Sequence, residues 1–396
     1  MSLAGRRVVL GVSGGIASYK ACTIARLLTK AGAHVDVVLT SAGAEFVRPV
    51  TFEALTGRPV LSSLWDRGRA LDHVRLADDP ELIIVAPATA NLIARCAQGI
   101  ADDALCAILL ARASAVLLAP AMNDKMYANE ITQQNIAALK ARGWETVGPE
   151  VGALAEGPSD LPGRMSEPED IFAVAERKLL GGGALSGKRV LVSAGPTREG
   201  MDPVRVITNR SSGLMGIEVA REAYSRGADV TLVMGPTSLP PPYGVGTIRV
   251  ESTVDLAAAI ADHVSHADVF VMAAAPADYK PVEVSADKLA RSNGRLSVEL
   301  EPTLDILEST APERKADCFC VGFALEAGDN IERAREKMRR KRLDLVVYNR
   351  VDIEGAGFEV ATNRVTLMTK DGEQELPLMA KRAVAHKLFD VIEAGV

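Results

Sequence analysis

The chain has 396 residues, 48% of them hydrophobic, which is enough for two or three domains with sizeable cores. Its formal net charge of -6 disfavours general binding to nucleic acid or to anionic membranes. No apolar run is long enough to span a bilayer, the first residues show no signal-peptide pattern, and the five cysteines form no CxxC pair. We therefore expect a cytoplasmic protein in a reducing compartment, without membrane or nucleic-acid partners.

The chain begins with a pattern typical of a βαβ unit. Residues 7–13 form a mostly apolar run that predicts a buried strand, and residues 34–40 predict a second strand. Between them, Gly14, Gly15 and Ile16 are expected to open a helix that extends to about Lys30, with Ile16 among its apolar positions. The unit places a loop that can bind phosphate at its first turn. A glycine turn without a ligand is the alternative.

Small polar residues follow three successive predicted strands. Thr40 and Ser41 end the second strand, and the segments 87–91 and 120–123 follow the next two apolar runs. In an open parallel sheet, the carboxyl ends of the strands form the edge where ligands bind. The sequence therefore predicts a ligand site at this edge.

These segments resemble the flavoprotein family of cysteine decarboxylases, over about residues 7–169. The resemblance implies that the chain binds FMN and oxidises a peptidyl or pantothenoyl cysteine. It implies that His73, in a His-Val-x-Leu motif, is a base near the flavin, although a lone histidine is more often structural. It also implies that Asn123 holds the substrate carboxylate. The residues expected to bind FMN are Gly14, Gly15, Ile16, Thr40, Ser41, Thr89 and Asn91.

One position departs from that family. The segment 154–165 resembles the family's substrate-clamping loop, which commonly has a cysteine where this chain has Glu156. In the family, that cysteine donates a proton to the enethiolate intermediate. Glu156 can replace it only if burial or a nearby anion favours its protonated form. A solvated carboxylate without a catalytic part is the alternative.

The second half begins after a glycine run at residues 181–183, which marks a linker, so we place the domain boundary between residues 183 and 184. A predicted strand at 188–192 leads into a long loop, 193–216, which carries Arg205 and Asn209 and precedes a predicted helix. The backbone N–H groups and the dipole at a helix start favour a bound anion. The loop matches neither the G-x-G-x-x-G nor the Walker pattern.

Further candidate ligand-binding residues follow along this half. Small residues at 273–277 end a predicted strand and would let a base or sugar approach the backbone, while Asp278 suits Mg²⁺ or a ribose hydroxyl. Lys288 follows ten residues later and could reach phosphate. Lys337 and Lys341 share one face of a basic helix. A solvated helix face or a nucleic-acid patch is the alternative for that helix.

The loop 193–216 resembles the phosphopantothenate–cysteine ligase motif, through its Ala-Gly-x-Thr start, Asp-Pro-Val-Arg, Thr-Asn and Ser-Ser-Gly. The resemblance implies that CTP converts 4′-phosphopantothenate into an acyl-cytidylate that the cysteine amine attacks. It implies that Arg205 and Asn209 orient the acyl group, and that Lys288 is catalytic and, with Mg²⁺ on Asp278, neutralises the triphosphate. The residues expected to bind CTP are Met272, Ala273, Ala274, Asp278, Lys288, Leu304, Asp305, Ile306, Leu307, Phe323, Lys337 and Lys341.

Together the two resemblances are those of bifunctional coenzyme A biosynthesis enzymes. We expect an α/β protein with two doubly wound Rossmann-like domains: a flavodoxin-like decarboxylase at 1–183 and a ligase at 184–396. The implied substrates are CTP, 4′-phosphopantothenate and cysteine, the final product is 4′-phosphopantetheine, and the implied assembly is a homo-oligomer with trimer contacts around each flavin. The alternatives are an NAD(P)-dependent oxidoreductase and a non-catalytic binding relative of the flavoproteins.

Overall fold

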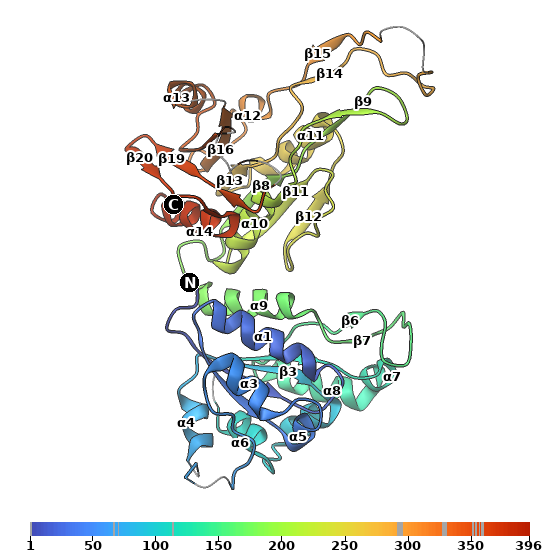
Figure 1. Cartoon of the computed structure of the whole chain (residues 1–396), viewed down its shortest axis with the longest axis vertical. Helices are drawn as coiled ribbons and strands as arrows, with labels where there is room; N and C mark the ends of the chain where they lie inside the picture. Colours follow the sequence, from blue (N-terminus) through green and yellow to red (C-terminus); the bar gives the residue numbers. More distant parts are fainter. Residues whose placement is uncertain are drawn as a thin grey trace. The chain divides into compact units, whose positions relative to one another are not determined.

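The computed structural model describes residues 2–65, 68–69, 71–112, 115–290, 296–326, 331–350, 352, 355, 357 and 360–396. The chain forms two compact units, Met1–Leu180 and Gly181–Val396 (Figure 1). None of the described helices is long and apolar enough to cross a membrane.

The first unit is built on a five-stranded parallel sheet with the strand order β2-β1-β3-β4-β5. This order is the flavodoxin-like one, in which ligands bind where the strand order reverses, beside β1 and β3. The central strands are buried on both faces and are correspondingly apolar. The strands are β1 (Arg7–Val12), β2 (His34–Leu39), β3 (Leu82–Ala88), β4 (Val116–Pro120) and β5 (Glu145–Thr146).

Nine described helices and a small hairpin surround this sheet. The helices are α1 (Ser18–Lys30), α2 (Ser41–Ala44), α3 (Pro49–Thr56), α4 (Asp72–Asp78), α5 (Ala90–Gln98), α6 (Ala104–Ala111), α7 (Asp124–Ala128), α8 (Glu130–Ala141) and α9 (Pro168–Leu180). The hairpin pairs β6 (Glu150–Val151) with β7 (Pro162–Arg164).

The first helix begins later than the sequence predicts. Helix α1 begins at Ser18, whose Oγ donates to the carbonyl oxygens of Ser13 at 2.9 Å and Gly15 at 2.6 Å and so holds the loop in a turn. Ile16 therefore lies in the loop, where it is 67% exposed, and the prediction that it packs on the helix's apolar face is wrong. This places an apolar side chain at the sheet edge.

The second unit contains an eight-stranded sheet with the order β12-β11-β8-β13-β16-β17-β19-β20. Neighbouring strands are parallel as far as β17, and β19 and β20 complete the sheet in antiparallel orientation. The strands are β8 (Arg189–Ala194), β11 (Asp229–Met234), β12 (Gly246–Arg249), β13 (Val269–Met272), β16 (Phe319–Glu326), β17 (Leu345–Arg350), β19 (Val365–Thr369) and β20 (Gly372–Glu375).

Helices cover both faces of this sheet, as the doubly wound prediction requires. One core cluster joins one face to α10 (Leu214–Ser225) and α14 (Lys381–Glu393). A second cluster joins the other face to α11 (Thr253–Val264), α12 (Ile306–Ser309) and α13 (Ile331–Arg340). The predicted α/β class with largely parallel sheets is confirmed in both units.

Three short antiparallel pairs complete the second unit. Two of them, β9 (Arg198–Gly200) with β10 (Val206–Thr208) and β14 (Tyr279–Pro281) with β15 (Leu300–Pro302), extend away from the sheet (Figure 1). The third pairs β18 (Thr362–Asn363) with β21 (Met379–Ala380) and brings the C-terminal helix to the sheet.

A buried ionic network joins α10 to α14. Arg226 contacts three carboxylates: Glu222 at 2.8 Å, Asp390 at 2.9 Å and Glu393 at 2.7 Å. Burial alone would raise the pKa of Glu222, but hydrogen bonds from His386 and Arg226 and nearby positive charge hold it below its usual value. The network therefore keeps the Glu222 carboxylate charged inside the helix pair.

Candidate active sites

A cavity of about 780 Å³ opens at the carboxyl edge of the first sheet. The loops after β1, β2, β3 and β4 all contribute to its wall, as expected for loops that meet at the carboxyl edge of a parallel sheet. Its lining includes Gly14, Gly15, Ile16, Thr40, Ser41, Thr89 and Asn91, together with Asn123 and Glu156.

Hydrogen bonds and close packing hold the first loops of this cavity together. Ser13 Oγ donates to the carbonyl oxygen of Pro87 at 2.8 Å and accepts from the backbone N–H of Thr89 at 3.2 Å. A Cβ on Gly14 would lie 2.4 Å from Cβ of Ala42, so this position requires glycine for packing. The result is a rigid wall with both polar and apolar groups, which fits a flat polar ring system.

Asn123 has its side-chain orientation fixed by the backbone that follows it. Its Oδ1 accepts hydrogen bonds from the backbone N–H groups of Lys125 at 2.9 Å and Met126 at 3.4 Å. Its Nδ2 donates to Oε1 of Glu156. Because the oxygen is occupied by the N-cap contacts, the amide offers N–H donors to a ligand.

The loop that carries Glu156 is tied down on both sides of this residue. The backbones of Leu154 and Gly157 exchange two hydrogen bonds, Leu154 N to Gly157 O at 2.8 Å and Gly157 N to Leu154 O at 3.1 Å. Further along, Ser159 Oγ donates to Asp124 Oδ2 at 2.5 Å. Glu156 lies in the tight turn between the first two contacts, and its side chain is exposed.

The structure does not bring His73 into the cavity of its own chain. His73 lies on α4, which packs against α6, and it is not among the cavity-lining residues. Its Nδ1 is buried without a hydrogen-bond partner, and its neighbours Leu71 and Val74 are 75% and 44% exposed. A role for His73 beside the flavin therefore requires a cavity other than that of its own chain.

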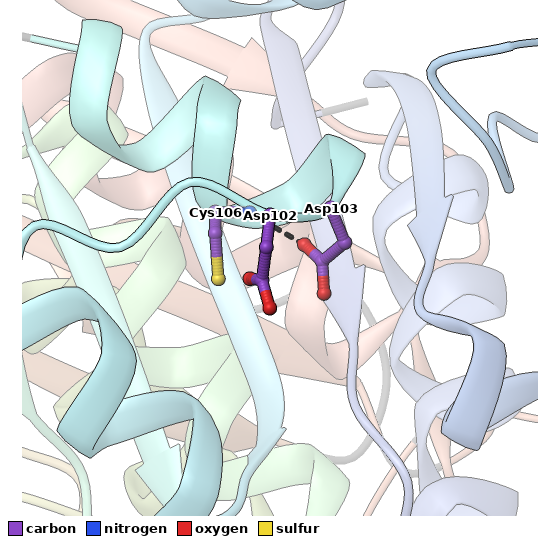
Figure 2. Close-up of side chains that lie close together, drawn as sticks. All are labelled: Asp102, Asp103 and Cys106. Atoms are coloured by element: carbon purple, nitrogen blue, oxygen red, sulfur yellow. Dashed lines mark hydrogen bonds between the residues drawn. The ribbon is translucent and has the colours of Figure 1, made fainter.

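A group of acidic and thiol side chains lies near the start of α6. Figure 2 shows Asp102, Asp103 and Cys106, whose ligand atoms lie within 4.8 Å of one another. Asp103 Oδ1 accepts from the backbone N–H of Cys106 at 2.8 Å, so this carboxylate caps the helix. Arg95 forms ion pairs with both carboxylates. Arg95 therefore neutralises the negative charge that would otherwise attract a metal cation.

The second unit has a cavity of about 410 Å³ at the carboxyl edge of its own sheet. Residues from β13, from the segment before α12, from β16 and from α13 contribute to it. Its lining includes Met272, Ala273, Ala274, Asp278, Leu304, Asp305, Ile306, Leu307, Phe323, Lys337 and Lys341.

Lys337 of α13 and Lys341, which directly follows this helix, both line this cavity. Lys341 Nζ lies 2.7 Å from Oδ2 of Asp305, and Lys337 Nζ donates to the carbonyl oxygen of Phe323 at 2.7 Å. Burial, together with the charge of Lys341, lowers the pKa of Lys337 to about 8. A buried cation with a depressed pKa gains from an incoming anion, because the anion stabilises its charged form.

Asn209, in the loop 193–216, contacts the wall of this cavity. Its Nδ2 donates to the carbonyl oxygens of Ala275 at 3.0 Å and Pro276 at 2.8 Å, both of which are cavity-lining residues. Asn209 is not itself among the lining residues. The amide therefore fixes the position of the loop relative to the end of β13.

Arg205 and Lys288 lie outside the cavity lining, next to the extended hairpins. A guanidinium nitrogen of Arg205 donates to the carbonyl oxygen of Leu289 at 3.0 Å, and the Leu289 N–H donates to Asp202 Oδ2 at 3.1 Å. These contacts hold the segment that contains Lys288, whose side chain is exposed. The structure thus groups Arg205 with Lys288 but separates both from the lining of the cavity.

Three buried polar residues of this cavity were missed by our sequence analysis: Asn349 of β17, Asn363 of β18 and Lys381 of α14. Asn363 and Lys381 meet because β18 pairs with β21, directly before α14. The available signal was a polar residue interrupting an apolar strand pattern, which applies to Asn349 in β17 but not to Asn363. Nothing in the local sequence distinguishes Lys381 from a solvated lysine.

Comparisons with known proteins give the same division of the chain. The family model described as Flavoprotein matches residues 1–180, and the model described as DNA/pantothenate metabolism flavoprotein C-terminal domain matches residues 185–396. Proteins named coenzyme A biosynthesis bifunctional protein CoaBC are similar over almost the whole chain. The one from Vibrio cholerae is 44% identical, covering 99% of this chain and 98% of its own, and the one from Bacillus subtilis is 42% identical, covering 98% and 97%.

A crystal structure of the C-terminal domain of a protein of that name is 42% identical to this chain. It covers 53% of this chain and 96% of its own, with a TM-score of 0.46.

Proposed function

Because the chain belongs to the family of bifunctional coenzyme A biosynthesis proteins, we propose that its two cavities are the active sites of a ligase and a flavin-dependent decarboxylase that act in sequence. The family places the flavoprotein decarboxylase in the first unit and the ligase in the second. The observation that carries the assignment of sites is that each unit has its own cavity at the carboxyl edge of its sheet.

In the second unit, we propose that CTP binds with its phosphates near Lys337 and Lys341 and with Mg²⁺ on Asp278. Both lysines line the cavity, and the depressed pKa of Lys337 favours an anionic ligand. The carboxylate of 4′-phosphopantothenate attacks the α-phosphorus of CTP and releases pyrophosphate, giving an acyl-cytidylate. The amine of cysteine then attacks the acyl carbon, releases CMP and loses a proton. The positive charges stabilise the leaving pyrophosphate.

Residues of the loop 193–216 would orient the acyl group. Asn209 is supported by its contacts with the cavity wall at Ala275 and Pro276. Arg205 and Lys288 are supported by the family resemblance and by the hydrogen bond from Arg205 to Leu289, the residue after Lys288, but not by contact with the cavity.

In the first unit, we propose that the cavity binds FMN and the cysteine end of 4′-phosphopantothenoylcysteine. The volume of the cavity, its exposed Ile16 side chain and the hydrogen-bonded loops at Ser13 and Thr89 fit a flat ring with polar edges. FMN supplies a two-electron oxidation of the substrate and later returns the two electrons. Asn123 would hold the carboxylate through its N–H donors until it leaves as carbon dioxide.

The proposal for His73 as a base implies an assembly of several copies. His73 lies outside its own cavity, with a buried unpartnered Nδ1 and exposed apolar neighbours at Leu71 and Val74. Exposed apolar side chains around a functional residue are typical of an interface. We therefore propose a homo-oligomer in which His73 serves the flavin cavity of a neighbouring copy.

The enethiol left by decarboxylation needs a proton on the carbon that carried the carboxylate. Glu156 lies beside Asn123, the proposed anchor of that carboxylate, and we propose that it delivers this proton. Its exposure in a single chain means that the neighbouring copy or the substrate must shield it.

The proposed function is tested by the visible spectrum of the purified protein and by its products with CTP, cysteine and 4′-phosphopantothenate. We expect a yellow protein, release of pyrophosphate and CMP, and conversion to 4′-phosphopantetheine with release of carbon dioxide. A yellow protein that forms 4′-phosphopantothenoylcysteine but releases no carbon dioxide would refute the decarboxylase assignment and favour a non-catalytic flavoprotein half.

A further inference from the structure

The amide of Asn123 is occupied by a carboxylate from the chain itself. Its Nδ2 donates to Oε1 of Glu156, and both residues line the first cavity. The other end of the amide cannot take part, because Oδ1 already accepts from the backbone N–H groups of Lys125 and Met126. An amide held in this way presents only donors, so it selects an acceptor such as a carboxylate.

The position of Glu156 follows from the turn that carries it. The two hydrogen bonds between Leu154 and Gly157 close a tight turn, and Ser159 ties the next part of the loop to Asp124. The backbone is thus held beside Asn123. The side chain of Glu156 is exposed, and in the described part of the chain it takes part in no ion pair, so it is free to rotate away.

The cations nearby do not hold Glu156. Lys20 and Arg164 also line the cavity, but both are paired with Glu167, at 3.1 Å and 3.0 Å. Among the residues that the structure describes, it is therefore Asn123 that holds the Glu156 carboxylate in place. Two ionised carboxylates repel each other strongly at one donor group, so an incoming carboxylate must displace the ionised Glu156 carboxylate or place a proton on it.

We propose that Glu156 is an internal competitor for the carboxylate anchor of the first cavity. It occupies Asn123 in the free enzyme and yields it to the carboxylate of the bound substrate. It returns when the carboxylate has left, so it opposes binding of the substrate but not of the decarboxylated product. This inference rests on the proposed decarboxylase function, and it assigns a specificity-determining role to the position at which the chain departs from its family.

The test compares two unreactive ligands on the full-length, flavin-loaded protein. One is 4′-phosphopantothenoylserine, whose hydroxyl replaces the reactive thiol, and the other is its counterpart without the carboxylate. Isothermal titration calorimetry gives the affinity of each for the native protein and for Glu156→Ala, Glu156→Gln and Asp160→Asn. Asp160 is an exposed carboxylate of the same loop that does not line the cavity, so its variant is the matched control for charge.

We expect Glu156→Ala to bind the serine ligand about three- to tenfold more tightly, the range for releasing one hydrogen bond to a partly exposed charged group. Glu156→Gln should gain less, because its neutral carbonyl can still accept from Asn123. The ligand without the carboxylate should bind all four proteins equally, and Asp160→Asn should match the native protein for both ligands. Unchanged or weaker binding of the serine ligand to Glu156→Ala would overturn the inference. If the native protein binds neither ligand, the decarboxylase proposal itself fails, and this inference fails with it.

Discussion

The depressed pKa of Lys337 predicts that the affinity for CTP falls as the pH rises from 7 to 9. Burial lowers this pKa to about 8, helped by Lys341 and opposed by the carboxylates of Asp305, Glu326 and Asp278. If only the charged lysine binds the triphosphate, the observed affinity is the intrinsic affinity multiplied by the charged fraction. That fraction is about 90% at pH 7 and about 10% at pH 9, because one pH unit on either side of a pKa gives a tenfold ratio.

The expected loss of CTP affinity is therefore about tenfold between pH 7 and pH 9, or about 1.4 kcal/mol. The phosphates of CTP do not contribute a change of this sign, because phosphate groups with a pKa of about 6 are already ionised at pH 7. Near pH 8, binding should also take up about half a proton, since the bound phosphate restores the charge on Lys337. Calorimetry in two buffers with different ionisation enthalpies measures both quantities.

Two variants of α13 distinguish the contribution of Lys337 to CTP binding from that of the rest of the site. Lys337→Gln should bind CTP more weakly at pH 7, and its affinity should then be nearly independent of pH. Arg339→Gln removes the same charge from an exposed position outside the cavity, so it should keep the native pH dependence. A native affinity that stays constant from pH 7 to pH 9, or a slope that persists in Lys337→Gln, would refute this reasoning.

Three other predictions concern both units. Asn209→Asp should still bind CTP but block amide formation, because the aspartate loses the hydrogen bonds donated to Ala275 and Pro276 and its charge repels the anionic acyl intermediate; wild-type turnover would contradict it. Glu156→Gln should accumulate the enethiol product, two mass units below 4′-phosphopantetheine by simple hydrogen counting, whereas full conversion would show that solvent or another group supplies the proton. Arg226→Ala should destabilise the α10–α14 pair by about 1–3 kcal/mol, because it removes one partner of the buried Glu222 carboxylate while His386 and Arg382 remain. Hydrogen exchange of residues 214–225 and 381–393 would detect that loss, and the double variant Arg226→Met with Glu222→Gln should recover part of the protection.

The fold could be predicted from sequence because the central parallel strands, such as β1, β3, β4 and β13, are continuous apolar runs followed by small or polar residues. Parallel strands bring their carboxyl ends to one edge, so this pattern also predicted which loops meet, such as those at Gly15, Thr89 and Asn123. The start of α1 was placed too early because apolar periodicity counted Ile16, whereas the Ser18 hydroxyl keeps the preceding residues in a loop.

Positions that depend on distant or exposed segments could not be predicted. Lys381 reaches its cavity because β21 pairs with β18, and no local pattern indicates that pairing. His73 matches a motif, but a motif does not reveal that its helix lies away from its own chain's cavity. Two backbone N–H groups set the orientation of the Asn123 amide. The sequence alone does not distinguish an asparagine held in this way from an exposed asparagine without such bonds.

The two cavities differ in when they can be completed as the ribosome makes the chain. The lining of the first cavity ends at Glu167, within a unit that closes at Leu180. The second cavity needs Lys381, which lies in the last helix and reaches the site through the β18–β21 pair. Because domains generally fold as units from the N-terminus during synthesis, the first unit can form its cavity while the second is still being translated. A complete lining of the second cavity therefore requires synthesis through Lys381, and premature termination before this residue would remove ligase activity while leaving an intact flavin-binding unit.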